Sequence, residues 1–146
     1  MVDEELRLAM VFNGCVYNHH ELRRELQGHG YRFTSVSDTE VILKAYHHWG
    51  TACVERFVGM FAFVISELDT GRLVLGRDRL GIKPLYLSQT PQRLRFASNC
   101  PPCCRRDVDS TIDKVALHHY LSWHSVFPPR ERSCPASRNS RPPPSG

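Results

Sequence analysis

The sequence predicts an α+β fold in which helices and antiparallel strands occupy separate stretches of the chain. Two stretches in the first third begin with a capping residue and carry apolar residues at helical spacing, residues 18–28 and 37–50. From residue 60 the pattern changes to short, β-rich apolar runs joined by turns of a few residues. Connections that short join antiparallel strands, because parallel strands need a long crossover. Helices grouped before and after such strands indicate a layered α+β domain.

The first expected element is a buried strand within residues 6–17, which are rich in apolar side chains. It runs into Asn13-Gly14, the strongest short signal for a hairpin turn. The local sequence alone therefore favours a turn at this pair.

A short helix is expected next. Asn18 has the chemistry of an N-cap, with Glu21 three residues later, and Leu22 and Leu26 share one helical face. Glycines at 28 and 30 end the helix.

Residues 31–36 alternate in polarity and predict a strand. Ser37 and Glu40 then match a capping box, and Asp38 adds a favourable acid to the first turn of a second helix. Its apolar face is expected to hold Val41, Ile42, Ala45, Tyr46 and Trp49, and Gly50 ends it. Thr51 begins a further short helix.

The second half predicts a strand meander and one more helix. Strands are expected at 60–65, 73–75, 85–87 and 94–97, with turns at 69–71 and 90–92, and the helix at 110–122. Beyond residue 127 the chain is rich in Pro, Arg and Ser, so residues 128–146 are predicted to be disordered.

Composition excludes two classes of partner. The net charge of +4 is scattered, and the densest basic run, residues 130–141, has no aromatic side chain on which bases could stack, so nucleic acid is not an expected partner. No apolar segment approaches the roughly 20 residues of a membrane span. With no basic-then-apolar leader, the sequence predicts a cytoplasmic protein whose six cysteines are reduced.

Asn13 and Gly14 also have the chemistry of an oxyanion hole. A side-chain amide beside a glycine N–H offers two donors, and glycine lets a substrate approach the backbone closely. Asp38, taken alone, is better explained as a helix-start carboxylate outside any active site.

Five blocks of residues decide between these alternatives. Together they closely resemble the class II (Ntn-type) glutamine amidotransferase domain of the asparagine synthetase family. The blocks occur in the family's order, at residues 11–22, 37–42, 59–63, 77–86 and 96–98.

The resemblance implies roles for four residues. Asn13, through its side chain, and Gly14, through its N–H, would be the catalytic oxyanion donors. Asp38 would bind the α-ammonium group of glutamine, and Cys15 would line the pocket. Asparagine synthetases carry Glu at the position of Cys15, and a Cys there is similar to the N-acetylglutaminylglutamine amidotransferase branch. The expected substrate-binding residues are thus Asn13, Gly14, Cys15 and Asp38, with no metal site.

The family fold is an αββα sandwich of antiparallel sheets between helical layers. Residues 1–98 resemble its middle and later part, so the N-terminal strands are expected to be missing. The family's nucleophile is an N-terminal cysteine whose own α-amino group is the general base, and it is expected upstream of Met1. Residues 108–127 would begin a linker helix towards a missing synthetase domain that uses ATP and Mg.

By resemblance, the reaction is hydrolysis of glutamine to glutamate and ammonia, which is delivered for ATP-dependent amide formation. This chain alone is expected to be inactive, with no cofactor of its own. The alternative is a non-catalytic remnant, or pseudo-amidotransferase, that binds glutamine or a partner. The acceptor, aspartate or a glutamine dipeptide, stays open.

Cys100, Cys103 and Cys104, followed by three histidines, invite a zinc interpretation, but the histidine spacing does not fit one. We interpret residues 99–107 instead as an aberrant segment, read one nucleotide out of frame where the family has an apolar helical stretch. The same hypothesis covers residues 136–145.

Overall fold

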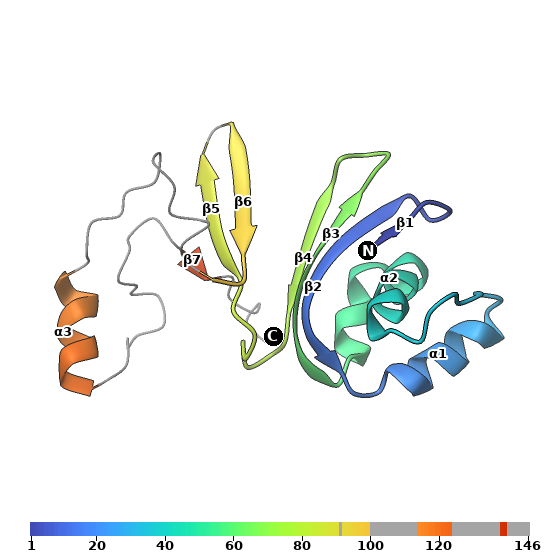
Figure 1. Cartoon of the computed structure of the whole chain (residues 1–146), viewed down its shortest axis with the longest axis horizontal. Coiled ribbons are helices and arrows are strands. Elements are labelled where there is room, and N and C mark those ends of the chain that lie inside the picture. The colour runs from blue at the N-terminus through green and yellow to red at the C-terminus, as the bar shows by residue number, and fades with distance from the viewer. Residues whose placement is uncertain (91, 100–113, 124–137, 140–146) are drawn as a thin grey trace. The chain divides into compact units, whose positions relative to one another are not determined.

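The computed structural model describes residues 1–90, 92–99, 114–123 and 138–139, in two compact units. The first unit comprises Met1–Lys83, and the second begins at Pro84 (Figure 1). Each unit has an antiparallel sheet of its own. The predicted α+β class with antiparallel strands is confirmed.

The first unit is a sheet with strand order β1-β2-β3-β4, whose helices lie between β2 and β3 in the chain. In Figure 1 the helices cover one face of this sheet. The strands are β1 (Val2–Asp3), β2 (Leu8–Val16), β3 (Gly59–Glu67) and β4 (Leu73–Arg77). The helices are α1 (His19–Gly28), α2 (Asp38–Trp49) and the 3₁₀ helix η1 (Gly50–Arg56).

The core of this unit lies between the sheet and the helices. Alternate residues of β2 and β3 point to this side, as the period of two in a strand requires. They pack with the apolar faces of α1 and α2, and the predicted Leu22, Leu26, Val41, Ile42 and Ala45 are buried there. The strand residues of the core are Leu8, Met10, Val16, Phe61, Phe63 and Ile65.

Residues 31–36 do not form the predicted strand. The N–H groups of Thr34 and Ser35, which a β-ladder would need, donate instead to the Glu40 carboxylate in α2. Polarity alternates here without a neighbouring strand, so the alternation was misleading.

The two predicted helix starts differ from the prediction in the hydrogen bonds of their capping residues. The Asn18 side chain makes no capping bond; it donates to Arg56 O at 2.9 Å and accepts from Val58 N at 3.0 Å. Ser37 does cap α2, because its Oγ accepts from Thr39 N at 3.1 Å. The predicted Glu40 half of the capping box is wrong, since that carboxylate bonds the preceding loop.

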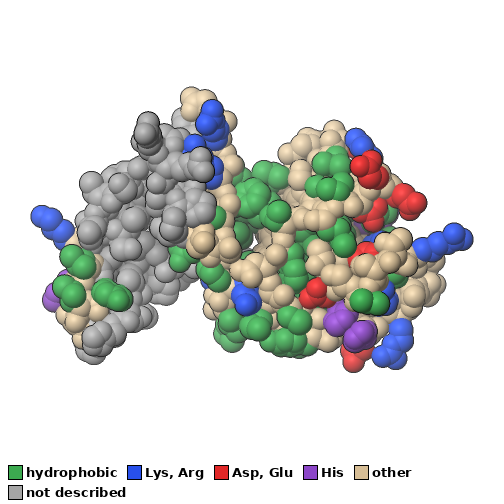
Figure 2. Space-filling model, viewed as in Figure 1, with side chains coloured by type: hydrophobic (Ala, Val, Ile, Leu, Met, Phe, Trp, Pro, Cys, Tyr) green, Lys and Arg blue, Asp and Glu red, His purple; other side chains and the backbone are tan. Residues whose placement is uncertain are grey.

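Large apolar side chains are also exposed in the first unit. Figure 2 shows hydrophobic side chains among the charged ones on its surface. They include Tyr17, Val58, Leu80 and Ile82, of which Leu80 is the most exposed at 83%. This unit therefore presents apolar surface to water.

The second unit has strand order β6-β5-β7. Its elements are β5 (Tyr86–Thr90), β6 (Arg93–Ala97), α3 (Lys114–Trp123) and β7 (Arg138–Asn139). The strand β7 pairs with Tyr86 and Leu87 of β5, through Asn139 and Arg138. The rest of 128–146 and all of 99–107 except Asn99 lie outside the described residues.

Candidate functional site

Asn13 and Gly14 lie within β2, not in a turn. They pair with Ala62 and Phe61 of β3, so the hairpin interpretation of Asn-Gly is wrong. Gly14 has a φ of 146°, and a Cβ there would come 2.1 Å from Met60 O. Glycine is required at this position because the two strands approach too closely for a side chain.

The N–H of Gly14 points to the edge of β2 that faces away from β3. N–H groups of alternate strand residues share one edge. At this edge Met10 N–H donates to Met1 O at 2.8 Å, and Val16 N–H donates to Asp38 Oδ2 at 3.0 Å. Gly14 belongs to the same alternate set, so its N–H and the Asp38 carboxylate lie along one edge.

The Asn13 side chain lies on the face of the sheet opposite the helices. In β2, the core residues Met10 and Val16 point to the helices. Because side chains alternate along a strand, Asn13 and Cys15 point to the other face. Asn13 is half-buried, and no hydrogen bond joins its side-chain amide to any residue that the structure describes.

Asp38 reaches β2 from the first turn of α2. Ser37 caps the helix, which directs the Asp38 side chain to the end of the strand. The carboxylate therefore accepts from a backbone N–H of β2 and adds a negative charge at the helix N-terminus, where it is favourable.

Cys15 is half-buried and pairs with Met60 across the ladder. Its thiol shares a face with Asn13, two residues away. The structure thus places Asn13, Gly14 and Cys15 next to one another near the end of β2, where Asp38 contacts Val16.

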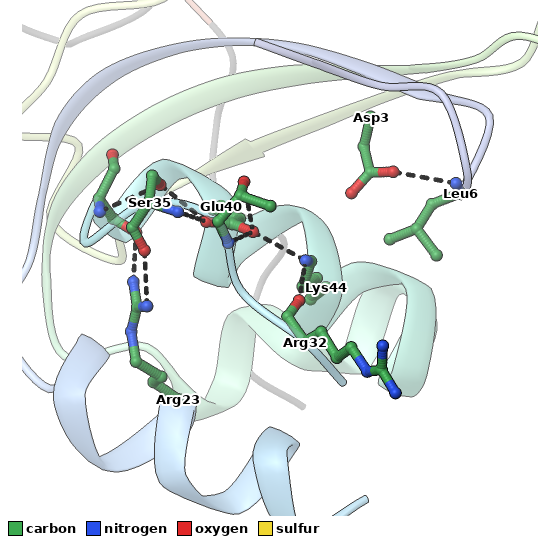
Figure 3. A network of polar contacts seen from close by, with 9 residues as sticks. Asp3, Leu6, Arg23, Arg32, Ser35, Glu40 and Lys44 are labelled. Atoms are coloured by element: carbon green, nitrogen blue, oxygen red, sulfur yellow. Dashed lines mark hydrogen bonds and ion pairs between the residues drawn. The ribbon is translucent and has the colours of Figure 1, made fainter. Parts of the chain in front are cut away.

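Sequence reasoning missed the residues that hold the loop before Asp38. The Glu40 carboxylate accepts from Thr34 N at 2.9 Å, from Ser35 N at 2.8 Å and from Lys44 Nζ at 2.8 Å (Figure 3). Burial raises the pKa of Glu40, but these hydrogen bonds outweigh burial and lower it from 4.5 to about 2. The only sequence signal was an acid at the third helical position, which a capping box explains equally well.

This shift predicts an acid-dependent loss of stability. The pKa of Glu40 is lower in the folded state than in the unfolded state, so its contribution is complete above about pH 4.5 and is lost towards about pH 2. Glu40→Gln should therefore cost free energy of unfolding near neutral pH, on the order of 3 kcal/mol, and much less at about pH 2.5. Urea unfolding at several pH values measures this.

Glu25→Gln is the matched control, because Glu25 pairs with Arg56 at 2.6 Å in a partly exposed position. An exposed pair contributes at most about 1 kcal/mol. Parallel pH profiles for wild type and Glu40→Gln would contradict the role assigned to the buried carboxylate.

The segment after β4 forms a hydrogen-bonded turn. Asp78 is buried and accepts from Phe61 N at 3.2 Å, Ile82 N at 2.9 Å and Lys83 N at 3.1 Å. Burial raises the pKa of Asp78, but the hydrogen bonds from these backbone N–H groups outweigh burial and hold the pKa below its usual value. The turn is thereby tied to β3 next to Met60.

A separate hollow of about 370 Å³ lies at the other end of the β2–β3 ladder. Its lining includes Leu6, Tyr46, Glu67 and Arg72 and none of the four predicted site residues. In the described part of the chain, no group of three or more His, Cys, Asp or Glu side chains is placed to hold a metal ion. The cysteines at 100, 103 and 104 lie outside that part. No helix among the described residues is long and apolar enough to cross a membrane.

Comparisons with known proteins show the family to which the chain belongs. The model of the glutamine amidotransferase domain family matches residues 1–137. Asparagine synthetase [glutamine-hydrolyzing] 1 of Bacillus subtilis is 41% identical over 120 residues, which are 82% of this chain and 19% of that protein. Asparagine synthetase [glutamine-hydrolyzing] 3 of the same organism is 34% identical over 110 residues, 75% of this chain and 18% of that protein.

The fold has a solved counterpart. Glutamine phosphoribosylpyrophosphate amidotransferase from B. subtilis matches with a TM-score of 0.55 and 24% identity, over 62% of this chain and 21% of that one. This likeness supports the predicted Ntn-hydrolase fold. The chain spans about a fifth of the length of the asparagine synthetases that it matches. With a family model that covers nearly all of its residues, the chain belongs to the glutamine amidotransferase domain family, as a class II domain of the asparagine synthetase kind.

Proposed function

We propose that the edge of β2 binds glutamine, with its carboxamide oxygen at Asn13 and Gly14 and its α-ammonium group at Asp38. The observation that carries this proposal is the hydrogen bond from Val16 N–H to Asp38 Oδ2. It fixes a carboxylate on the same strand edge as the Gly14 N–H, two residues away.

The spacing suits glutamine. Two residues of a strand span about 6.7 Å. In extended glutamine the carboxamide oxygen and the α-nitrogen lie about 6 Å apart, from standard bond lengths. One substrate molecule can therefore reach the Gly14 N–H and the Asp38 carboxylate together.

This pocket supplies stabilisation of the transition state. Attack of a nucleophile on the carboxamide carbon puts negative charge on its oxygen, which the Asn13 amide and the Gly14 N–H would stabilise. Collapse of the tetrahedral intermediate breaks the C–N bond and releases ammonia, and water then hydrolyses the acyl-enzyme to glutamate. In the full reaction we propose, an N-terminal cysteine supplies the nucleophile and a synthetase domain using ATP and Mg consumes the ammonia.

Neither thiol of the described residues suits the role of nucleophile. Cys53 is fully buried, and burial raises its pKa to about 12, so almost no thiolate forms near neutral pH. Cys15 lies on the strand that carries the proposed oxyanion donors. We therefore assign it a place beside the substrate oxygen and not the role of nucleophile. We therefore propose that the 146-residue chain alone is inactive.

The corresponding prediction is that this chain releases no ammonia from L-glutamine. A coupled ammonia assay should give the same background rate for wild type and Cys15→Ala. A wild-type rate above that of Cys15→Ala would make Cys15 a nucleophile and overturn the assignment.

We further propose that Cys15 places the chain nearer to the N-acetylglutaminylglutamine amidotransferase branch than to enzymes that form asparagine. A cysteine sulfur on the face of Asn13 is a weak acceptor, so it cannot replace a carboxylate as the acceptor of a charge-assisted hydrogen bond from the substrate. Cys15→Glu should then tighten the binding of L-glutamine. Weaker binding in that variant would count against this finer assignment.

NMR titration of the chain with L-glutamine tests the pocket itself. The backbone amide resonances of Gly14 and Val16 should shift on binding, and Asp38→Asn should greatly reduce the effect. Asp69→Asn is the control, because it removes the same charge from an exposed pair with Arg7 far along the ladder. Shifts confined to the hollow beside Tyr46 and Glu67, or no shifts, would contradict the proposal.

A further inference from the structure

The loop between α1 and α2 is held from two sides by buried or half-buried charged groups. From α2, Glu40 accepts from the N–H of Thr34 and of Ser35, and also from the Ser35 hydroxyl at 2.7 Å. Lys44 pairs with Glu40 and also donates to Arg32 O. Glu40 is 3% exposed and Lys44 is 8% exposed, so both charges are withdrawn from water.

From α1, Arg23 holds the same loop by its carbonyl groups. Its Nη1 donates to Ser35 O at 2.6 Å, and its Nη2 donates to Ser37 O at 3.2 Å. The guanidinium also lies over the Phe33 ring, 4.4 Å from the centroid. Ser35 thus donates its N–H to Glu40 and accepts a hydrogen bond from Arg23 at its carbonyl, as Figure 3 shows.

These contacts lead directly to Asp38. Arg23 holds the carbonyl of Ser37, whose Oγ in turn caps α2. The next residue is Asp38, and its carboxylate meets Val16 N–H. The position of this carboxylate therefore depends on how firmly the Ser35–Ser37 segment is held.

Stability alone does not account for this arrangement. Replacing a buried ion pair with packed apolar residues is often neutral or stabilising, so such a pair is weak evidence for a stability role. A network that fixes a backbone segment next to a ligand group does confer geometric precision, which packing of apolar groups confers less well.

We infer that Arg23 and Glu40, with Lys44, are positioning residues that set the specificity of the site for a substrate bearing an α-ammonium group. They touch no substrate atom; they act by holding Ser35–Ser37 and so the Asp38 carboxylate. This inference rests on the proposed glutamine pocket.

The test compares two ligands, L-glutamine and 4-carbamoylbutanoate, which lacks the α-amino group, by NMR titration of the 146-residue chain. The wild type should bind L-glutamine about tenfold or more tightly, the effect of one charged hydrogen bond. In Glu40→Gln, the side-chain NH2 would face the N–H groups of Thr34 and Ser35, which are also donors. Lys44 would lose the carboxylate with which it pairs. This variant should reduce this preference to within about threefold, while the affinity for 4-carbamoylbutanoate changes by less than about twofold.

Arg23→Lys is the second variant. Lysine keeps the positive charge but lacks the planar guanidinium group whose two nitrogens donate to the two carbonyls. This variant should also lose the preference, and it provides the test if Glu40→Gln does not fold. Glu25→Gln, which breaks the Arg56 pair outside the loop, should keep the wild-type preference.

The outcomes separate the two proposals. If the wild type itself shows no preference, the assignment of Asp38 in the glutamine pocket fails. If the wild type shows the preference and the folded variants keep it, the positioning role is overturned. It is equally overturned if the variants weaken both ligands by the same factor, because that result indicates general damage to the pocket.

Discussion

Replacing Asn13 by alanine should lower kcat by about 10²–10³ in a glutaminase assembled from this chain, the loss typical of one oxyanion donor. The assembly would join, ahead of Met1, the N-terminal segment of a relative that carries the family's nucleophilic cysteine. In the tetrahedral intermediate the substrate oxygen bears nearly full negative charge, whereas in the ground state it bears little. As the proposed oxyanion donor, the Asn13 amide would act mainly in the transition state, so its loss should appear in kcat.

Two further variants make this result specific. Asp38→Ala removes a contact that is present in both ground and transition states, so it should mainly raise KM. Asn18→Ala is the matched amide control: it breaks the bonds to Arg56 and Val58, away from the proposed oxyanion, and should leave kcat of the folded enzyme nearly unchanged. If Asn13→Ala kept kcat within about twofold, Asn13 would not be an oxyanion donor.

Replacing Gly14 by alanine should destabilise the first unit by about 2–6 kcal/mol. The new Cβ would lie 2.1 Å from Met60 O and 2.7 Å from Phe61 Cα, both backbone atoms of a paired strand. Overpacking of this kind costs about 1–3 kcal/mol. A φ of 146° adds strain for any residue with a side chain, about 1–3 kcal/mol.

Gly71→Ala separates the two causes. Gly71 also has a positive φ, of 70°, but a Cβ there would meet no atom within 4 Å. Its cost in urea unfolding should therefore be only that of backbone strain, roughly 1–2 kcal/mol. A Gly14→Ala variant as stable as Gly71→Ala would show that β2 and β3 are not as close as the structure places them.

Much of the first unit was predictable because its signals are local. Short sequence patterns predict three of its features: the apolar face of Leu22 and Leu26, the Ser37 cap and the end of α2 at Gly50. Gly50 has a φ of 60°, as expected for a glycine that ends a helix. These elements are confirmed because the apolar period and the capping chemistry point to the same structure.

The errors come from contacts that the local sequence pattern does not specify. Asn13-Gly14 has the local signature of a turn, but pairing with residues 61 and 62 keeps it in a strand, and the glycine serves close approach to Met60. Glu40 has the local signature of a cap, but the loop ahead of α2 recruits its carboxylate. The two-residue strands β1 and β7 are too short to leave any periodic pattern.

For the candidate site too, sequence patterns indicated some residues and missed others. The four predicted residues were found through the order of motifs along the chain, and the structure brings Gly14 and Asp38 to one strand edge through Val16. Arg23 and Lys44 gave no such signal, because a charged residue on a helix is ordinarily solvated. Their contacts with the loop depend on how α1 and α2 pack.

The most direct measurement is the structure of the assembled glutaminase after reaction with 6-diazo-5-oxo-L-norleucine, a glutamine analogue whose diazo ketone alkylates a nucleophilic thiol with loss of N₂. The ketone oxygen of the adduct occupies the place of the substrate oxygen. The account predicts this oxygen about 2.7–3.1 Å from both Asn13 Nδ2 and Gly14 N, with the α-ammonium group at Asp38. An adduct whose oxygen lies beyond hydrogen-bond distance of both donors, or whose ammonium group is bound elsewhere than at Asp38, would contradict it.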